Sequence, residues 1–213
     1  MTQGIIVTGT DTGIGKTVFA AALAGALGAT YWKPIQCGLD DDGGAGAGDK
    51  ERVQALSGLA PARLLPERYR LAMPASPHRA AEAEGIEISL ADLAAPDVEG
   101  PLVVEGAGGL MVPVNRQALM IDVFAAWRWP VVLVARTALG TINHSLLSIE
   151  ALNGRNIPIL GIAFVGDEMP DTERTIAEMG NVRALGRLPH IAPLHRDSLA
   201  RAFAAHFDVE DFR

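Results

Sequence analysis

Residues 9–17 read Gly-Thr-Asp-Thr-Gly-Ile-Gly-Lys-Thr and follow the apolar run Ile-Ile-Val at 5–7. An alanine- and leucine-rich segment, 18–27, comes directly after them and predicts a helix. A strand, a glycine-rich turn and a helix in this order are the setting of a phosphate-binding loop. Gly13 and Gly15 would let backbone N–H groups curl around phosphate oxygens, and the start of the helix adds a partial positive charge. The stretch therefore predicts a nucleotide-binding site.

Two side chains of this loop have expected roles. Lys16 would neutralise the β- and γ-phosphates of a nucleotide, and the Thr17 hydroxyl would bind Mg²⁺. The spacing departs from the standard pattern, because Gly9 lies one residue too early and Thr10 stands where a glycine is expected. A glycine-rich turn that opens an ordinary helix is the alternative. The strand, the Gly-Lys-Thr run and the helix together favour the nucleotide site.

The composition narrows the classes of protein. The 213 residues are 49% hydrophobic and 20% charged, which suits one α/β domain over residues 1–213 with a sizeable core. The formal net charge of −7 argues against a nucleic-acid-binding or anionic membrane surface. A single cysteine, Cys37, rules out an intrachain disulfide. With neither a signal peptide nor an apolar run of about 20 residues, we expect a cytoplasmic protein without a membrane span.

Strand and helix signals alternate along the rest of the chain. Apolar runs predict strands at 29–32, 102–104, 131–134, 159–165 and 184–185. Helices are expected at 49–57, 77–84, 121–128, 141–153, 171–179 and 197–206, with at most a short helix in 86–99. Residues 40–48 are rich in aspartate and glycine and predict a mobile loop. The alternation predicts a mostly parallel central sheet flanked by helices on both faces.

Several polar residues should meet at one edge of this sheet. Because parallel strands share their carboxyl ends, the phosphate loop, Lys33, Glu105 and Arg136 should line one crevice. Glu105, at the expected end of a strand, would hold Mg²⁺. For Asp49 an N-cap of the helix that it starts is the simpler interpretation, and a Mg²⁺ ligand beside Thr17 and Glu105 is the alternative. Lys33 is either a solvated strand end or a point charge beside a transferred phosphoryl group.

Five blocks of the sequence resemble one known family. They are Gly-Thr-Asp-Thr-Gly-Ile-Gly-Lys-Thr (9–17), Trp-Lys-Pro-Ile-Gln-Cys-Gly (32–38), Ser-Pro-His (76–78), Val-Glu-Gly-Ala-Gly-Gly (104–109) and Leu-Gly-Thr-Ile-Asn-His (139–144). In this order and spacing they resemble the dethiobiotin synthetases. The resemblance implies a phosphate-loop NTPase fold and an ATP- and Mg²⁺-dependent cyclo-ligase of biotin synthesis. In that family CO₂ carbamylates 7,8-diaminopelargonic acid, ATP phosphorylates the carbamate, and the second amine closes the ureido ring.

The resemblance also implies roles for individual residues. Lys16 and Lys33 would be catalytic at the transferred phosphoryl group, with Thr12 near the substrate amines. ATP and its metal would be bound by Gly13, Ile14, Gly15, Lys16, Thr17, Val18, Asp49, Glu105, Gly106, Ala107, Gly108, Pro189, His190 and Ile191. Of these, Thr17, Asp49 and Glu105 would hold Mg²⁺. The substrate would contact Thr12, Lys33, Cys37 and Gly108, and its carboxylate would lie on Gly140, Thr141, Ile142 and Asn143 of the neighbouring subunit in a homodimer.

Three features depart from the family pattern. Cys37 stands where a serine commonly contacts substrate, and a thiol is a weaker donor. The run Phe-Val-Gly-Asp at 164–167 lacks the asparagine that often reads the adenine edge, which predicts a relaxed base preference. Residues 86–100 are short for the helix expected there.

Three other classes of protein fit less well. Partition- and septum-site-type ATPases carry a lysine where Asp11 stands, and their binding surfaces are typically basic. Amide ligases of cobalamin synthesis add a glutaminase domain, for which 213 residues leave no room. A dinucleotide-binding Rossmann domain would need a third glycine in its fingerprint.

Overall fold

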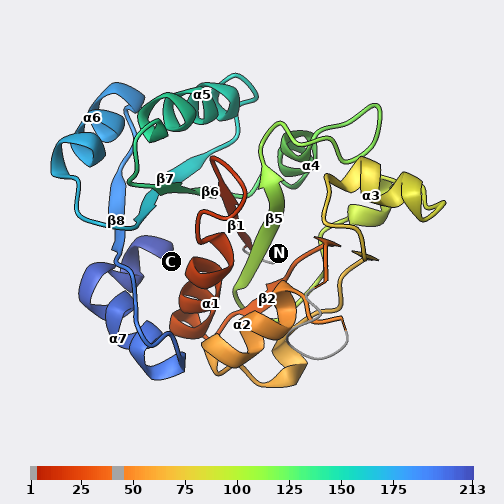
Figure 1. Ribbon diagram of the computed structural model, residues 1–213, viewed down its shortest axis with the longest axis horizontal. Coiled ribbons are helices and arrows are strands. Elements are labelled where there is room, and N and C mark those ends of the chain that lie inside the picture. Colours follow the sequence, from red (N-terminus) through yellow and green to blue (C-terminus); the bar gives the residue numbers. More distant parts are fainter. Residues whose placement is uncertain (1–3, 40–45) are drawn as a thin grey trace.

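A six-stranded sheet runs through the computed structural model, which describes residues 4–39 and 46–213 (Figure 1). Every neighbouring pair of its strands is parallel. In spatial order the strands are β2 (Thr30–Trp32), β5 (Leu102–Gly109), β1 (Gly4–Gly9), β6 (Val131–Arg136), β7 (Ile159–Val165) and β8 (Ala184–Leu188). The central strands are continuous apolar runs because helices cover both of their faces. The predicted fold class is confirmed.

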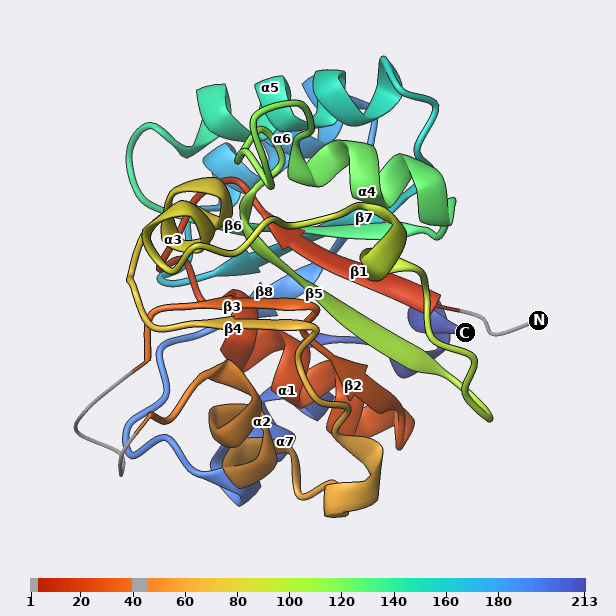
Figure 2. The same ribbon diagram turned by 90° about the vertical axis from the view of Figure 1, so that its right-hand side faces the viewer.

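The helices lie on both sides of the sheet, as Figure 2 shows. One face carries α1 (Lys16–Leu27), α2 (Asp49–Ser57) and α7 (Arg196–His206). The other carries α3 (Pro77–Ala83), α4 (Met120–Trp127), α5 (Thr141–Asn153) and α6 (Pro170–Gly180). Three short 3-10 helices complete the described part: Pro61–Arg63, Ala91–Leu93 and Val209–Phe212. In that part, no helix is both long and apolar enough to cross a bilayer.

Aromatic packing fixes α1 beneath the sheet. The ring of Phe19 lies 5.4 Å from that of Phe207 and 6.0 Å from that of Phe203, measured between centroids. These rings come from α1, from α7 and from the residue that follows α7. Burial of such side chains is worth about 1.5–3 kcal/mol each, so the helix that follows the phosphate loop is firmly anchored.

Two parts of the fold differ from the sequence prediction. A separate two-stranded parallel sheet, β3 (Ile35–Cys37) with β4 (Tyr69–Leu71), was not predicted. Strand β5 was predicted over 102–104 and continues to Gly109, through a run of glycines. A Cβ on Gly106 would lie 2.7 Å from Cζ of Phe124, so glycine is needed there for close packing within the strand.

The remaining boundaries agree closely with the prediction. Helix α1 begins two residues earlier than expected, at Lys16, and β8 extends three residues further, to Leu188. The segment 86–99 holds only the 3-10 turn Ala91–Leu93, in line with the expected short helix at most. Of the predicted mobile loop 40–48, residues 40–45 lie outside the described residues.

Candidate active site

The phosphate loop joins β1 to α1 with two glycines in the left-handed region. Gly13 has φ +72° and Gly15 has φ +99°, which favour glycine. A Cβ on Gly15 would also lie 2.9 Å from Cγ1 of Val165. Lys16 is the first residue of α1, and its Nζ donates to the carbonyl oxygen of Asp11 at 2.5 Å. The loop thus directs the start of a helix and a lysine toward the same space.

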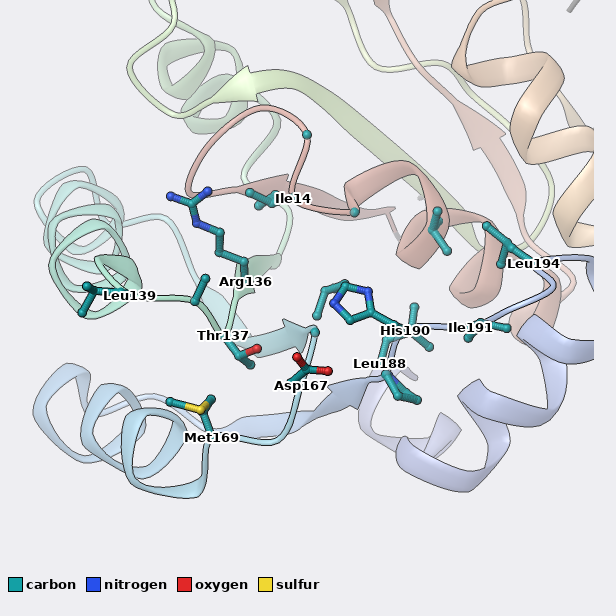
Figure 3. Close-up of a pocket in the computed structure, with 17 residues that line it drawn as sticks. Ile14, Arg136, Thr137, Leu139, Asp167, Met169, Leu188, His190, Ile191 and Leu194 are labelled. Carbon is teal, nitrogen blue, oxygen red and sulfur yellow. The ribbon is translucent and has the colours of Figure 1, made fainter.

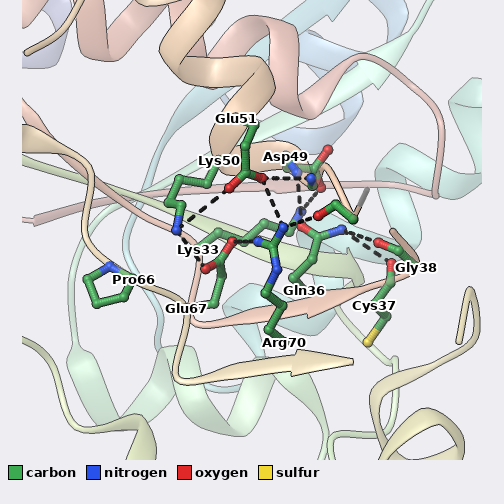
Figure 4. A network of polar contacts seen from close by, with 12 residues as sticks. Lys33, Gln36, Cys37, Gly38, Asp49, Lys50, Glu51, Pro66, Glu67 and Arg70 are labelled. Carbon is green, nitrogen blue, oxygen red and sulfur yellow. Dashed lines mark hydrogen bonds and ion pairs between the residues drawn. The ribbon is translucent and has the colours of Figure 1, made fainter. Parts of the chain in front are cut away.

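Beside the loop, two carboxylates and a hydroxyl converge. Oγ1 of Thr17 lies 2.8 Å from Oε1 of Glu105 and 3.1 Å from Oδ1 of Asp49. Nζ of Lys33 donates to Oε1 of Glu105 at 2.9 Å. It also donates to Oδ2 of Asp49, and Figure 4 shows these two residues. The Tyr31 hydroxyl donates to Oε2 of Glu105 at 2.7 Å. Both oxygens of this fully buried carboxylate therefore have partners.

The charges of these groups depend on one another. Burial alone would lower the pKa of Lys33, but the nearby carboxylates of Glu105 and Asp49 outweigh it and raise that pKa. For Asp49, burial is likewise outweighed, here by Lys33, and the pKa of the carboxyl is lowered. Burial lowers the pKa of Lys16 to about 8, against the attraction of Glu105. Lys33 is consequently a fixed cation near neutral pH, whereas Lys16 is close to its titration point.

Two cavities meet at the phosphate loop. One, of about 630 Å³, is lined by Lys16, Thr17, Lys33, Asp49 and Glu105 among others. The second, of about 540 Å³, lies on the other side of the loop and is shown in Figure 3. They share Gly13, Gly15 and Val18. A triphosphate along the loop would thus reach both spaces.

The structure distributes the predicted site residues between these cavities. The 630 Å³ cavity also contains Thr12, Cys37, Ala107 and Gly108, and the 540 Å³ cavity contains Ile14, Pro189, His190 and Ile191. Arg136 lies in the second cavity, near Ile14, so the expectation of one shared crevice was wrong (Figure 3). The strand C-termini are on one edge, but the loop divides that edge into two spaces.

Some predicted residues line neither cavity. Gly106 faces Phe124 inside the fold. Gly140, Thr141, Ile142 and Asn143 form the start of α5, with Gly140 at φ +91°. Thr141 is buried, and its hydroxyl has no hydrogen-bond partner among the described residues. Within one chain this segment does not join the lysines.

Two local assignments need correction. Asp49 is the first residue of α2, whose N-cap is Gly48, so the N-cap interpretation of Asp49 was wrong. Its backbone N–H is taken by Oε1 of Gln36 at 3.1 Å, which leaves the carboxylate for Thr17 and Lys33. Glu105 lies within β5 and not at its end, because the strand continues through the glycines.

Three polar residues at the site were not predicted. Tyr31 holds Glu105 from the neighbouring strand, and Arg52 and Ser76 line the 630 Å³ cavity. Arg52 follows Asp49 by three residues on a predicted helix, and this spacing places both on one face. Ser76 belongs to the Ser-Pro-His block. Nothing in the sequence indicated the role of Tyr31, because the pattern of a short apolar strand does not show which of its side chains faces a carboxylate.

The convergent oxygens suit a magnesium ion. Mg²⁺ prefers hard oxygen ligands and is usually held by one or two carboxylates with water and phosphates. Thr17, Asp49 and Glu105 supply a hydroxyl and two carboxylates, and a cation, the Lys33 ammonium, already bridges the acids. Within 4–39 and 46–213, no three His, Cys, Asp or Glu side chains converge, so these oxygens are a two-carboxylate set.

Comparison with solved structures supports the fold. The septum site-determining protein MinD complexed with Mg-ADP from Pyrococcus horikoshii is 15% identical, with a TM-score of 0.54 over 95% of this chain and 86% of that one. A ParA family ATPase from Chlorobium tepidum is 14% identical, with a TM-score of 0.52 over 100% of this chain and 93% of the other. At these identities the likeness is one of fold alone.

Comparison of sequences is more specific. The AAA domain family model matches residues 3–198. The ATP-dependent dethiobiotin synthetase BioD of Rhodopseudomonas palustris (strain BisB5) is 63% identical over 212 residues, covering 100% of this chain and 98% of that protein. The enzyme of the same name from Brucella anthropi is 59% identical, with the same coverage. At such identity over its full length, the chain belongs to the family of ATP-dependent dethiobiotin synthetases.

Proposed function

We propose that this chain is a dethiobiotin synthase that acts as one ATP-dependent ligase domain over residues 1–213. It closes the ureido ring of dethiobiotin from 7,8-diaminopelargonic acid and CO₂, and it releases ADP and phosphate. The observation that carries the proposal is the convergence of Lys16, Lys33 and the Thr17–Asp49–Glu105 oxygens on one cavity. An anionic carbamate and the end of a triphosphate both need positive charge at that place.

The two lysines divide the work between them. Lys16 begins α1 beside the phosphate loop, where its charge and the helix N-terminus favour phosphate oxygens. Lys33, which stays charged because its pKa is raised, would stabilise negative charge on the carbamate and on the transferred phosphoryl group. Thr12 lines the same cavity and would orient the amines. The carbamate oxygen takes the phosphoryl group, the second amine then attacks the carbonyl carbon, and phosphate leaves.

The oxygens of Thr17, Asp49 and Glu105 would hold Mg²⁺. When bound, this ion neutralises charge on the phosphates of ATP. Asp49 and Glu105 also form ion pairs with Lys33, so a metal held by these carboxylates would compete with Lys33 and would leave its ammonium available to the substrate. Glu105 keeps its hydrogen bond from Tyr31 throughout, which fixes the carboxylate in the buried strand.

The 540 Å³ cavity would take the ribose and base of ATP, against Pro189, His190 and Ile191. A carboxylate, Asp167, lines it, at the end of the run 164–167 that lacks the asparagine often found in the family (Figure 3). An ionised carboxylate only accepts hydrogen bonds, so it cannot also donate to a ring nitrogen of adenine as an asparagine amide can. We therefore expect turnover with GTP and CTP within about tenfold of that with ATP. Exclusive use of ATP in steady-state assays would contradict a relaxed base preference.

We infer that the substrate carboxylate is bound by a second copy of the chain, through Gly140–Asn143. Two observations support a homodimer. Leu139, beside this segment, is fully exposed, and Leu147 of α5 is 56% exposed. A further cavity of about 510 Å³ runs from Thr12 to Leu147, and Met111 lines it. Light scattering should give a dimer that Leu147→Asp dissociates, and a monomeric, fully active wild-type protein would refute the assignment.

We place the enzyme in the cytoplasm.

Product formation tests the function. Purified protein with Mg²⁺, ATP and bicarbonate should release phosphate only when 7,8-diaminopelargonic acid is added, with dethiobiotin detected by mass in equal amount. Phosphate release that ignores the diamine would indicate an ATPase switch and would contradict the proposal. Lys33→Ala should remain folded in the presence of Mg²⁺ and lose turnover by about a thousandfold, the size expected for a group at the reacting phosphate.

A further inference from the structure

The carboxamide of Gln36 bridges the backbone on both sides of residues 40–45. Its Nε2 donates to the carbonyl oxygen of Gly38 at 2.8 Å, and its Oε1 accepts from the backbone N–H of Asp49 at 3.1 Å. Gln36 is only 5% exposed. A buried amide with partners at both ends has one favourable orientation. Gln36 therefore fixes the position of the Asp49 backbone relative to β3.

This contact replaces the usual cap of α2. The residue before the helix is Gly48, which has no side chain to accept from the first N–H groups. Gln36 accepts from Asp49, and Oε2 of Glu51 accepts from the N–H of Gly48 at 2.7 Å. An aspartate at a helix start commonly spends its own carboxylate on such N–H groups. Here the carboxylate is free to face Thr17 and Lys33.

A second side chain of the small β3–β4 sheet, that of Arg70, also contacts the residues around the start of α2. Arg70 of β4 is the register partner of Gln36. It donates to Oε1 of Glu67 at 2.6 Å and forms an ion pair with Oε2 of Glu51 at 3.3 Å (Figure 4). It also donates to the carbonyl oxygen of Gly46. The side chain of Glu67 is 3% exposed, so the base of this network is buried.

The packing leaves little room for α2 to shift. A Cβ on Gly48 would lie 3.1 Å from Cδ of Gln36, a closer approach than most side chains tolerate. Gln36 and Arg70 thus hold the helix start from two directions. The small β3–β4 sheet contributes no residue to the oxygen cluster itself. Its effect on the cluster is exerted through Asp49.

We propose that Gln36, supported by Arg70, is a positioning residue that directs the Asp49 carboxylate toward Thr17 and Glu105 and thereby sets the affinity for the divalent cation. The proposal rests on the function proposed above, because it requires Asp49 to bind the metal. Residues that orient metal ligands in this way commonly contribute 10- to 100-fold to metal affinity. Gln36 itself makes no contact with substrate.

Gln36→Met tests the proposal, because methionine keeps the length of the side chain and removes both hydrogen bonds. Gln54→Met is the matched control, because Gln54 lies exposed on α2, the helix that begins with Asp49. Binding of Mn²⁺ in the presence of saturating ADP is followed by the electron paramagnetic resonance signal of free Mn²⁺, and ADP binding is measured separately without metal. We expect about tenfold weaker Mn²⁺ binding for Gln36→Met, with unchanged metal-free ADP binding. Excess Mg²⁺ should restore most of kcat, which a general loss of structure would not allow.

Unchanged Mn²⁺ affinity in Gln36→Met would overturn the proposal. Asp49→Asn separates this result from a failure of the metal assignment. If Asp49→Asn also binds Mn²⁺ as the wild type does, Asp49 is not a metal ligand, and both the assignment and this inference are wrong. Should Gln36→Met not fold, Arg70→Met provides the same test at a partly exposed side chain: a several-fold loss of Mn²⁺ affinity is expected, and wild-type affinity overturns the proposal.

Discussion

Replacing Lys33 with methionine should strengthen divalent-cation binding while it abolishes turnover. The Lys33 ammonium lies 2.9 Å from Oε1 of Glu105 and contacts Oδ2 of Asp49, the same carboxylates that are proposed to bind Mg²⁺. A cation that binds there must first compete with this ammonium. Methionine has a similar length and no charge. It does not compete with the cation, and it leaves the negative charges of Asp49 and Glu105 without a positive partner.

The size of the effect follows from the geometry. Opposite charges about 3 Å apart attract by on the order of 5 kcal/mol at an effective dielectric constant of 20. Desolvation offsets most of this attraction for a buried pair. A net remainder of only about 1.4 kcal/mol corresponds to tenfold in affinity. We therefore expect Lys33→Met to bind Mn²⁺ at least tenfold more tightly, and to be about 3 kcal/mol less stable without metal because Asp49 and Glu105 lose their counter-charge.

Two measurements check this prediction. Mn²⁺ titration by electron paramagnetic resonance gives the affinity for the cation. Urea unfolding, measured once in EDTA and once in 10 mM Mg²⁺, gives the stability that the cation restores; this concentration is roughly a hundred times a typical dissociation constant. Arg79→Met removes one positive charge from an exposed position of α3 and controls for net charge. Weaker or unchanged Mn²⁺ binding in Lys33→Met would refute the reasoning, since it would mean that Lys33 and the metal do not share ligands.

Three further outcomes follow from the site. The pKa of Lys16 is about 8, and phosphate binds its protonated form, so ADP affinity should fall by up to tenfold per pH unit above about pH 8. Calorimetry would measure this fall. A Lys16→Arg variant whose ADP affinity falls equally steeply with pH would contradict the prediction. Tyr31→Phe removes a hydrogen bond to the buried carboxylate of Glu105 and should lower the free energy of unfolding in urea by about 1.5–3 kcal/mol. An unfolding midpoint equal to that of the wild type would show that this bond does not stabilise the fold. Gly15→Ala should weaken ADP binding at least tenfold. Gly28→Ala is the control: this glycine also has a positive φ but faces open space, so the variant should lose about 1 kcal/mol of stability and keep its ADP affinity. Equal ADP affinity in both variants would refute this account of the loop.

The phosphate loop and the central strands could be predicted because their signals are local. A glycine-rich turn between an apolar run and a helix has the same meaning in any fold, and buried parallel strands appear as continuous apolar runs. The resemblance to one family was equally local, since it rested on short blocks such as 9–17 and 104–109. These features depend on residues that are neighbours in the chain.

The parts that escaped prediction depend on distant contacts. Strands β3 and β4 have three residues each, which is too short for a periodic pattern. The N-cap interpretation of Asp49 failed because Gly48 is the N-cap, and the N–H of Asp49 itself is bound by Gln36, thirteen positions earlier. Residues 105–109 lay outside the predicted strand 102–104 because glycines are unusual within a strand, but the close approach of Phe124 requires the glycine at 106. In each case a tertiary partner overrides the local preference.

The bonds of Glu105 explain how one lysine could serve two places. A buried carboxylate that lost its only partner would bear the full cost of desolvation, and Lys33 could then not leave it. Glu105 has three donors: Tyr31 on Oε2, and Thr17 and Lys33 on Oε1. If Lys33 turned toward a carbamate, as the proposed mechanism requires, Thr17 and Tyr31 would still donate to Glu105, and a bound cation would supply the positive charge. The buried hydrogen bond from Tyr31 would thus lower the cost of releasing the lysine.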